Sequence, residues 1–317
     1  MKQLKLKKNR KRILLIALLS TTVLITMTAC NGPASNNSSS SDKLIYAVGA
    51  ENQYSDVIEQ IGGKYVSADA VLNNPSTDPH SYEADTKDAA AVENATLIVQ
   101  NGLGYDGFMD ELESSSPNPK REVIDVSKAL GYSENTSNPH LWYKPDTMPK
   151  IAALIEKNLE SQMPDQKVYF NKRLKTFDNS LKDWNNDLNK LSHAYNGVGV
   201  AVTEPVADYL LEAAHLNVKT PWGFQTSVMN GTDPSPQNVQ IQENLLKNKE
   251  VKVLIYNQQA TDDETSTLIK LAKSNNIPIV GVYETMPPKD DYQKWMEDET
   301  NNIFKALNKG VSTEVIS

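Results

Sequence analysis

The stretch from Asp165 to Ser192 contains neither glycine nor proline, and it constrains the fold more than any other feature. Its apolar residues recur at alternating spacings of four and three, which places them on one face of an α-helix. These residues are Phe170, Leu174, Phe177, Leu181, Trp184, Leu188 and Leu191. A two-stranded coiled coil would favour Leu, Ile and Val over these aromatic residues. We therefore expect one long helix at 163–193, a rod of about 40 Å that packs across both halves of the protein.

Strand-like and helix-like segments alternate on both sides of this stretch. Strands are expected at 43–48, 65–72, 96–100, 122–126, 197–203, near 218, and at 251–256 and 277–282. Such alternation predicts mostly parallel sheets with helices on their faces. We expect an α/β protein with two lobes, 44–162 and 194–317, joined by one long rigid helix. Ligands in such folds bind beyond the carboxyl ends of the strands.

The first 43 residues are expected to lie outside the folded body. Seven basic residues and no acidic residue precede a short apolar run that ends at Ala29, a pattern typical of a signal peptide at 1–29. Small residues directly before Cys30, the only cysteine, resemble a bacterial lipobox, so we expect a lipid on Cys30. A plain cleavable signal with an unpaired cysteine is the alternative. The Ser- and Asn-rich composition of residues 30–43 predicts a flexible tether. Together, the signal peptide, the lipid on Cys30 and the tether indicate an extracytoplasmic protein anchored to the cell membrane.

The charge of the mature chain bears on its partners. Without the seven basic residues of the signal, 25 Lys and Arg stand against 40 Asp and Glu, a net charge of −15. Nucleic-acid binding requires basic patches and is therefore not expected. A negative surface instead suits solubility and attracts cations.

Two of the four histidines lie in similar short motifs. His80 in Asp78-Pro79-His80 and His140 in Asn138-Pro139-His140 both follow a proline and precede an aromatic residue by two positions. Proline fixes φ and holds the preceding residue extended, so each imidazole projects from a stiff turn. A metal ligand needs to be oriented in this way, and we predict a metal site that uses both histidines.

Four motifs in register resemble the metal-binding solute receptors of bacterial ABC importers, whose two α/β lobes are joined by one rigid helix. The motifs are Asp78-Pro79-His80-Ser81-Tyr82-Glu83, Val99-Gln100-Asn101-Gly102-Leu103-Gly104, Asn138-Pro139-His140-Leu141-Trp142 and Asp233-Pro234-Ser235-Pro236. The resemblance covers nearly the whole mature chain. It implies a receptor that binds Zn²⁺ or Mn²⁺ between its lobes and delivers it, as a monomer, to a permease with its ATPase.

The resemblance also implies a ligand set. His80 and His140 match the first two ligands of the family, and Glu204 the third, where zinc-type members carry His and many manganese-type members carry Glu. The family usually has Asp as the fourth ligand; the first carboxylate after the last strand here is Glu284. This departure leaves Asp233 and Asn257 as alternatives for the fourth position.

The residue types agree with a mixed nitrogen and oxygen site. Two imidazoles and two carboxylates suit Zn²⁺ or Mn²⁺, whereas copper(I) would favour sulfur. We expect no metal at His193 or His215, which lie near helix ends. The H-E-x-x-H, G-x-S-x-G and P-loop patterns are absent, so an enzyme such as a zinc hydrolase is not expected. A surface adhesin is the other alternative function.

Overall fold

The computed structural model describes residues 44–77, 79 and 82–314. The predicted signal peptide (1–29), the tether (30–43) with Cys30, and His80 lie outside the described residues. Within those described ranges, no helix is long and apolar enough to cross a membrane.

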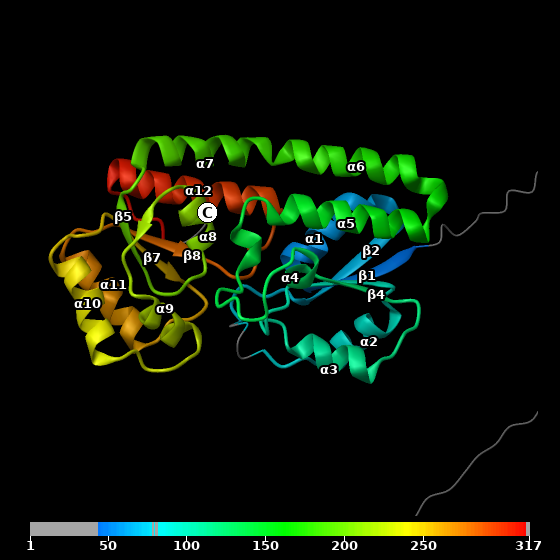
Figure 1. Cartoon of the computed structure of the whole chain (residues 1–317), viewed down its shortest axis with the longest axis horizontal. Helices are drawn as coiled ribbons and strands as arrows, with labels where there is room; N and C mark the ends of the chain where they lie inside the picture. The colour runs from blue at the N-terminus through cyan, green and yellow to red at the C-terminus, as the bar shows by residue number, and fades with distance from the viewer. Residues whose placement is uncertain (1–43, 78, 80–81, 315–317) are drawn as a thin grey trace, which may run out of the picture. The chain divides into compact units, whose positions relative to one another are not determined.

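The first half of the chain forms a parallel four-stranded sheet in the order β2-β1-β3-β4 (Figure 1). Its strands are β1 (Ile45–Glu51), β2 (Val66–Leu72), β3 (Leu97–Gln100) and β4 (Glu122–Asp125). The helices between and after them are α1 (Asn52–Gly62), α2 (Thr86–Asn94), α3 (Phe108–Ser115), α4 (Val126–Ala129) and α5 (Thr147–Gln162). Gly49 allows a close approach of β1 to α1, because a Cβ there would lie 2.4 Å from the backbone nitrogen of Ser55.

The second half repeats this topology with the order β6-β5-β7-β8, again all parallel. Its strands are β5 (Gly199–Val202), β6 (Asn217–Val218), β7 (Leu254–Asn257) and β8 (Ile279–Val282). Its helices are α8 (Asp208–Ala213), α9 (Trp222–Met229), α10 (Pro236–Lys247), α11 (Asp263–Ser274) and α12 (Tyr292–Lys309). The two parallel sheets confirm the predicted α/β fold class.

Local sequence explains where several helices begin. Asp85, Asp262 and Asp291 each accept a hydrogen bond from a backbone N–H in the first turn of α2, α11 and α12, which satisfies an otherwise unpaired donor. Ser235 caps α10 in the same way, with Pro236 at the first helical position. The last helix ends at Gly310, whose φ of 64° is in the left-handed region that favours glycine.

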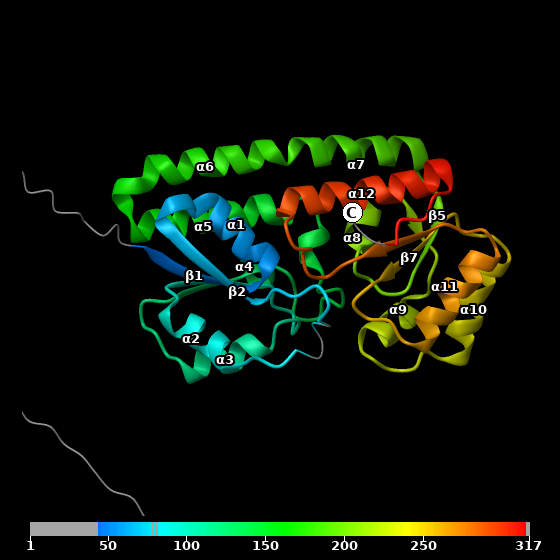
Figure 2. The same cartoon turned by 180° about the vertical axis from the view of Figure 1, so that it is seen from behind.

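The predicted long helix is formed by two helices in succession, α6 (Lys167–Ser180) and α7 (Lys182–Tyr195), with a break at Leu181. Figures 1 and 2 show both of them along one side of the body, over the two sheets. Arg173 on α6 donates to the backbone oxygen of Gln60 on α1 at 2.6 Å, and Trp184 on α7 donates to Thr300 on α12 at 2.9 Å. The helix pair therefore binds both halves, while the division at 44–162, 163–193 and 194–317 stays a prediction.

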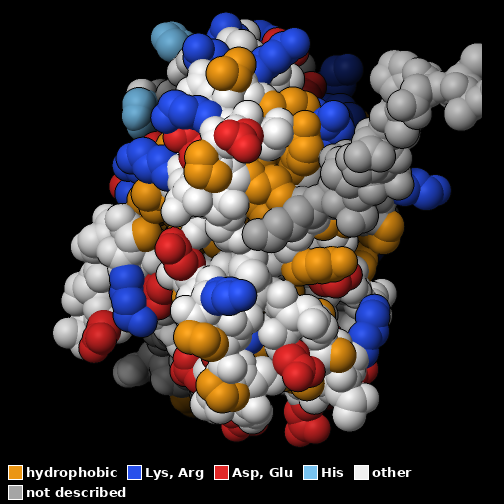
Figure 3. Space-filling model, turned by 90° about the vertical axis from the view of Figure 1, so that its right-hand side faces the viewer, with side chains coloured by type: hydrophobic (Ala, Val, Ile, Leu, Met, Phe, Trp, Pro, Cys, Tyr) orange, Lys and Arg blue, Asp and Glu red, His pale blue; other side chains and the backbone are white. Residues whose placement is uncertain are grey.

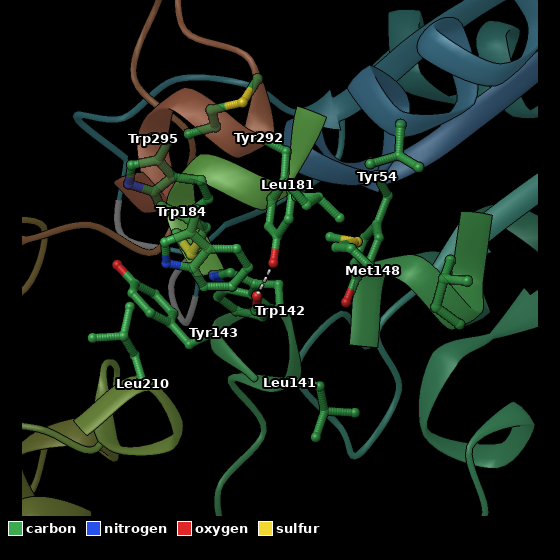
Figure 4. Close-up of a cluster of buried hydrophobic side chains, with 14 of the residues drawn as sticks. Tyr54, Leu141, Trp142, Tyr143, Met148, Leu181, Trp184, Leu210, Tyr292 and Trp295 are labelled. Carbon is green, nitrogen blue, oxygen red and sulfur yellow. Dashed lines mark hydrogen bonds between the residues drawn. The ribbon is translucent and has the colours of Figure 1, made fainter. Parts of the chain in front are cut away.

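One hydrophobic cluster includes side chains from both sheets and from the helices beside them. Figure 4 shows its centre, where the Tyr292 hydroxyl of α12 donates to the backbone oxygen of Trp142 at 2.6 Å. Trp142 belongs to a short 3₁₀ turn (Leu141–Tyr143) directly after His140. The core thus fixes the turn that carries one of the predicted ligands.

Candidate metal centre

The polar residues of the candidate site lie at the carboxyl ends of strands from both sheets. In each sheet the chain order reverses between the two central strands, and ligands in open parallel sheets bind at such a point. Glu51 ends β1 and Asn101 follows β3 in the first sheet. In the second, Glu204 follows β5 and Asn257 ends β7. Glu284, beyond β8, completes this set.

His140 is fully buried, and both of its ring nitrogens face an oxygen. Nδ1 lies 2.8 Å from Oδ1 of Asn138, and Nε2 lies 3.2 Å from Oε2 of Glu284. Asn138 is itself held, because its side-chain amide donates to the backbone oxygen of Pro205 and its backbone oxygen accepts from the Tyr209 hydroxyl. An amide oxygen at Nδ1 favours the tautomer with a proton there, which directs the lone pair of Nε2 toward the carboxylate.

Two buried carboxylates share one amide donor. Nδ2 of Asn257 donates to Oε1 of Glu284 at 2.5 Å and to Oε1 of Glu204 at 3.3 Å. The other oxygen of Glu284 accepts from the Tyr105 hydroxyl at 2.9 Å. Glu204 is 3% exposed and Glu284 0%, so this polar group is shielded from water. His140, Glu204 and Glu284, all predicted as ligands, are thereby brought to one place.

The alternatives for the fourth ligand have other environments. Asp233 is exposed in the loop between α9 and α10. The side-chain oxygen of Asn257 accepts from the backbone N–H of Gln259 at 3.0 Å, and its nitrogen serves the two carboxylates. Among the described residues, no three His, Cys, Asp or Glu side chains form a group that holds a metal ion as they stand.

Gln259 connects this group to the segment that contains His80. Its side-chain oxygen accepts from the backbone N–H groups of Glu284 and Thr285, at 2.6 and 2.9 Å. Its amide donates to the backbone oxygen of Thr77 at 2.8 Å. His80 itself lies outside the described residues. The nearby Thr77 is joined to the backbone of Glu284 through the hydrogen bonds of Gln259.

Aromatic rings surround the imidazole of His140. The ring centroids of Tyr105 and Trp142 lie 5.8 and 5.4 Å from it, both in edge-to-face geometry. Burial and then the nearby Glu284 raise the pKa of the Tyr105 hydroxyl well above its usual value, so it stays protonated and donates. The low-dielectric surroundings strengthen each electrostatic interaction made with a bound ion.

Residues 48–306 match the model of a protein family described as the periplasmic zinc-uptake complex component A. The chain belongs to this family. Its members are substrate-binding receptors, in agreement with the resemblance drawn from the four motifs.

Curated relatives of this family member cover almost its whole length. The manganese-binding lipoprotein MntA of Bacillus subtilis is 24% identical over 89% of this chain and 95% of its own. The manganese ABC transporter substrate-binding lipoprotein ScaA of Streptococcus gordonii is 23% identical over 94% of this chain and 99% of its own. The zinc-binding protein TroA of Treponema pallidum matches a shorter part, with 28% identity over 35% of this chain and 37% of its own.

Solved structures share the fold of this family member. The periplasmic zinc-binding protein TroA of Treponema pallidum superposes with a TM-score of 0.70 at 17% identity, over 85% of this chain and 99% of the other. A crystal structure of ZnuA gives a TM-score of 0.68 at 19% identity, over 84% of this chain and all of the other. These likenesses confirm the predicted two-lobed architecture.

Sequence reasoning missed Glu51, the last residue of β1. Its side chain is 0% exposed, and neither of its carboxylate oxygens has a hydrogen-bond partner among the described residues. Burial first, and then the negative charge of Asp106, raise its pKa well above 4.5; Glu284 adds to the rise. An acidic residue at the end of an apolar strand was the signal in the sequence that could have found it.

The two remaining histidines have local contacts that do not involve this site. His193 on α7 is exposed, and its Nδ1 lies 2.7 Å from the backbone oxygen of Asn189. His215, also exposed, has Nδ1 at 3.0 Å from the Ser192 hydroxyl. That neither of them binds the metal stays a prediction.

Proposed function

We propose that this protein is an extracytoplasmic receptor, anchored through a lipid on Cys30, that binds a divalent transition metal and delivers it to an ABC permease with its ATPase. The observation that carries the proposal is the contact between Nε2 of His140 and Oε2 of Glu284, 3.2 Å apart and both inaccessible to solvent. With Nδ1 hydrogen-bonded to Asn138, two lone-pair-bearing atoms face each other, an arrangement that a proton or a cation between them stabilises. Binding without catalysis is part of the proposal.

The proposed ligands are His80, His140, Glu204 and Glu284. Each histidine follows a proline in the sequence, and the carboxylates follow strands of the second sheet. An ion held by ligands from both halves would couple binding to the arrangement of the halves, which is how a permease could sense the loaded form. We further propose that the receptor acts as a monomer.

The cargo is proposed to be Zn²⁺ or Mn²⁺. Oxygen ligands suit Mn²⁺ and imidazole suits Zn²⁺, and the proposed set contains both types. Curated relatives bear the words manganese-binding or zinc-binding in their names. A role in nucleic-acid binding is not proposed: Figure 3 shows acidic side chains spread among the basic ones over one face of the body.

Elemental analysis of protein purified without chelator, followed by competition between the two ions, tests the function. We expect one bound ion per chain and a higher melting temperature with metal. A ligand that binds only the folded state adds about 4 kcal/mol of stability at a thousandfold excess over Kd. Protein that neither contains metal nor shows a thermal shift with Zn²⁺ or Mn²⁺ would contradict the proposal.

A further inference from the structure

Glu51 occupies the same topological position in the first sheet as Glu204 in the second. The strand orders β2-β1-β3-β4 and β6-β5-β7-β8 correspond, so β1 matches β5. Glu51 is the last residue of β1, and Glu204 comes two residues after the end of β5. Asn101 and Asn257 lie at the ends of the neighbouring strands β3 and β7. The repeated fold therefore places a carboxylate and an amide at the switch point of each sheet.

Among the described residues, its own backbone N–H favours the charged form of the buried Glu51 carboxylate, while burial and the neighbouring carboxylates oppose it. Both oxygens lack a hydrogen-bond partner there, although burial of an ion without a partner is strongly unfavourable. Nearby donors are directed elsewhere: the Tyr54 hydroxyl donates to Asn101, and the Tyr105 hydroxyl donates to Glu284. An unsatisfied buried polar group in a folded protein requires an explanation, and a role in binding a cation is one.

The charges around Glu51 are negative. The acidic groups that act on it electrostatically are Asp106 and Glu284. Asp106 is compensated, since it accepts from the backbone N–H groups of Asn101 and Gly102 at 2.5 and 3.0 Å. Glu51 and Glu284 together thus form an electronegative position to which a cation would be attracted.

The side chains of Asn52 and Gln53 hold the Glu51 segment against the backbone of the Glu284 segment. Asn52 donates through its amide to the backbone oxygen of Met286 at 2.7 Å and accepts from the N–H of Met286 at 3.0 Å. Gln53 donates to the backbone oxygen of Glu284 at 3.5 Å. These contacts join positions more than 230 apart in the sequence, so the two carboxylates belong to segments held in register.

We propose that Glu51 is a further ligand of the cargo metal, near Glu284. The inference rests on the proposed function and deepens it, because it adds a third carboxylate to the predicted set. A set rich in carboxylates matches the octahedral, oxygen-rich coordination of Mn²⁺ better than the four-coordinate preference of Zn²⁺.

The test compares Kd values of the parent and Glu51→Gln for Mn²⁺ and Zn²⁺, together with the electron paramagnetic resonance spectrum of bound Mn²⁺. Gln keeps the volume and removes the charge. We expect Glu51→Gln to bind Mn²⁺ about 10- to 100-fold more weakly than the parent. Removing a group that only supports a ligand already lowers affinity by this much, and removing a ligand should cost at least as much. Affinity for Zn²⁺ should fall less, and the Mn²⁺ spectrum should change.

Glu156→Gln is the matched control, because Glu156 on α5 is also buried with one unpartnered oxygen among the described residues. This part of α5 contacts the amino end of β4, where Asn158 donates to Glu122, and not the carboxyl ends of the strands. This control should bind both ions as the parent does. If Glu51→Gln does not fold, Glu51→Asp carries the test and should lower Mn²⁺ affinity through its shorter reach. A Glu51 variant with parental Kd values and an unchanged spectrum overturns the assignment while the receptor function stands. A parent that binds neither ion overturns both.

Discussion

In the second sheet, the carboxylates beyond β5 and β8 share one amide donor, Asn257, whereas the carboxylate at the end of β1 in the first sheet has no hydrogen-bond partner among the described residues. The strand orders of the two sheets correspond, so the topology does not cause this difference. It arises because the side-chain amides of Asn101 after β3 and Asn257 at the end of β7 donate to different groups.

In the first sheet, the amide of Asn101 donates to the backbone oxygen of Pro139 at 2.8 Å, directly before His140. The Tyr54 hydroxyl donates to its oxygen at 2.7 Å. Asn101 thus positions a histidine-bearing turn, while Asn257 positions two carboxylates. The same fold position supports an imidazole in one half and two carboxylates in the other, which are the residue types of the proposed mixed site.

The largest effect is expected for His140→Ala, which removes the imidazole that faces the carboxylates of the second sheet. Metal affinity should fall by at least about 100-fold, above the range typical of a group that only supports a ligand. Isothermal titration with Zn²⁺ and Mn²⁺ measures it. His215→Ala is the control, because His215 is exposed and contacts Ser192. If His140→Ala and His215→Ala bind metal with equal affinity, the imidazole of His140 is not a ligand.

A smaller effect is expected for Asn257→Ala, which makes the second sheet resemble the first by removing the shared donor. Glu204 and Glu284 then lose an amide that holds them together, and affinity should fall by about tenfold. The melting temperature of the metal-free protein should also fall, because a hydrogen bond to a charged group contributes about 1.5–3 kcal/mol. Isothermal titration and thermal unfolding measure the two effects.

Asn248→Ala is the matched control for Asn257→Ala. Its amide also donates to a carboxylate, that of Glu250 at 3.1 Å, but on the exposed surface. This variant should bind metal as the parent does. If Asn257→Ala binds metal as tightly as the parent, the amide that Glu204 and Glu284 share does not support metal binding by the second sheet.

The sequence predicted the sheets and His140 because their signals are local. Apolar runs and intervening helical periods define the strands, and the proline turn indicates His140. Glu204 and Glu284 were predicted from the resemblance to the receptor family, which places ligands after the corresponding strands. The break at Leu181 left no such signal. Its φ of −76° is helical, but its ψ of −5° lies outside the usual helical range. The apolar spacing continues across it, so the sequence pattern does not show the break.

The remaining residues could not be found because their contacts are distant in sequence. Tyr105 and Glu284 are separated by 179 positions, and Gln259 and Thr77 by 182. No spacing rule reports such pairs. Glu51 is a partial exception: its place at a strand end was readable, but its burial without a partner is a property of the folded state.

The smallest effect is expected for Glu299→Gln, which tests the support behind β8. Oε1 of Glu299 accepts from the Tyr143 hydroxyl, the Trp295 indole and the backbone N–H of Tyr283, whereas Glu51 accepts from none of the described groups. Burial raises the pKa of Glu299 from 4.5 to about 8. Between these values the folded state binds a proton that the unfolded state has lost, so this group makes the protein less stable as pH rises from about 4.5 to 8.

Gln cannot ionise and keeps an oxygen for the three donors, so that pH dependence should weaken in Glu299→Gln. Thermal unfolding of the metal-free protein from pH 5 to pH 8 measures it. Relative to the parent, the variant should gain at least about 3 °C in melting temperature over this range, which corresponds to about 1 kcal/mol for a body of this size. Glu111→Gln, at an exposed position on α3, should follow the parent. Parallel curves for Glu299→Gln and the parent would show that Glu299 is ionised in the folded protein, and that a hydrogen-bonded carboxyl group behind β8 is not what separates the second sheet from the first.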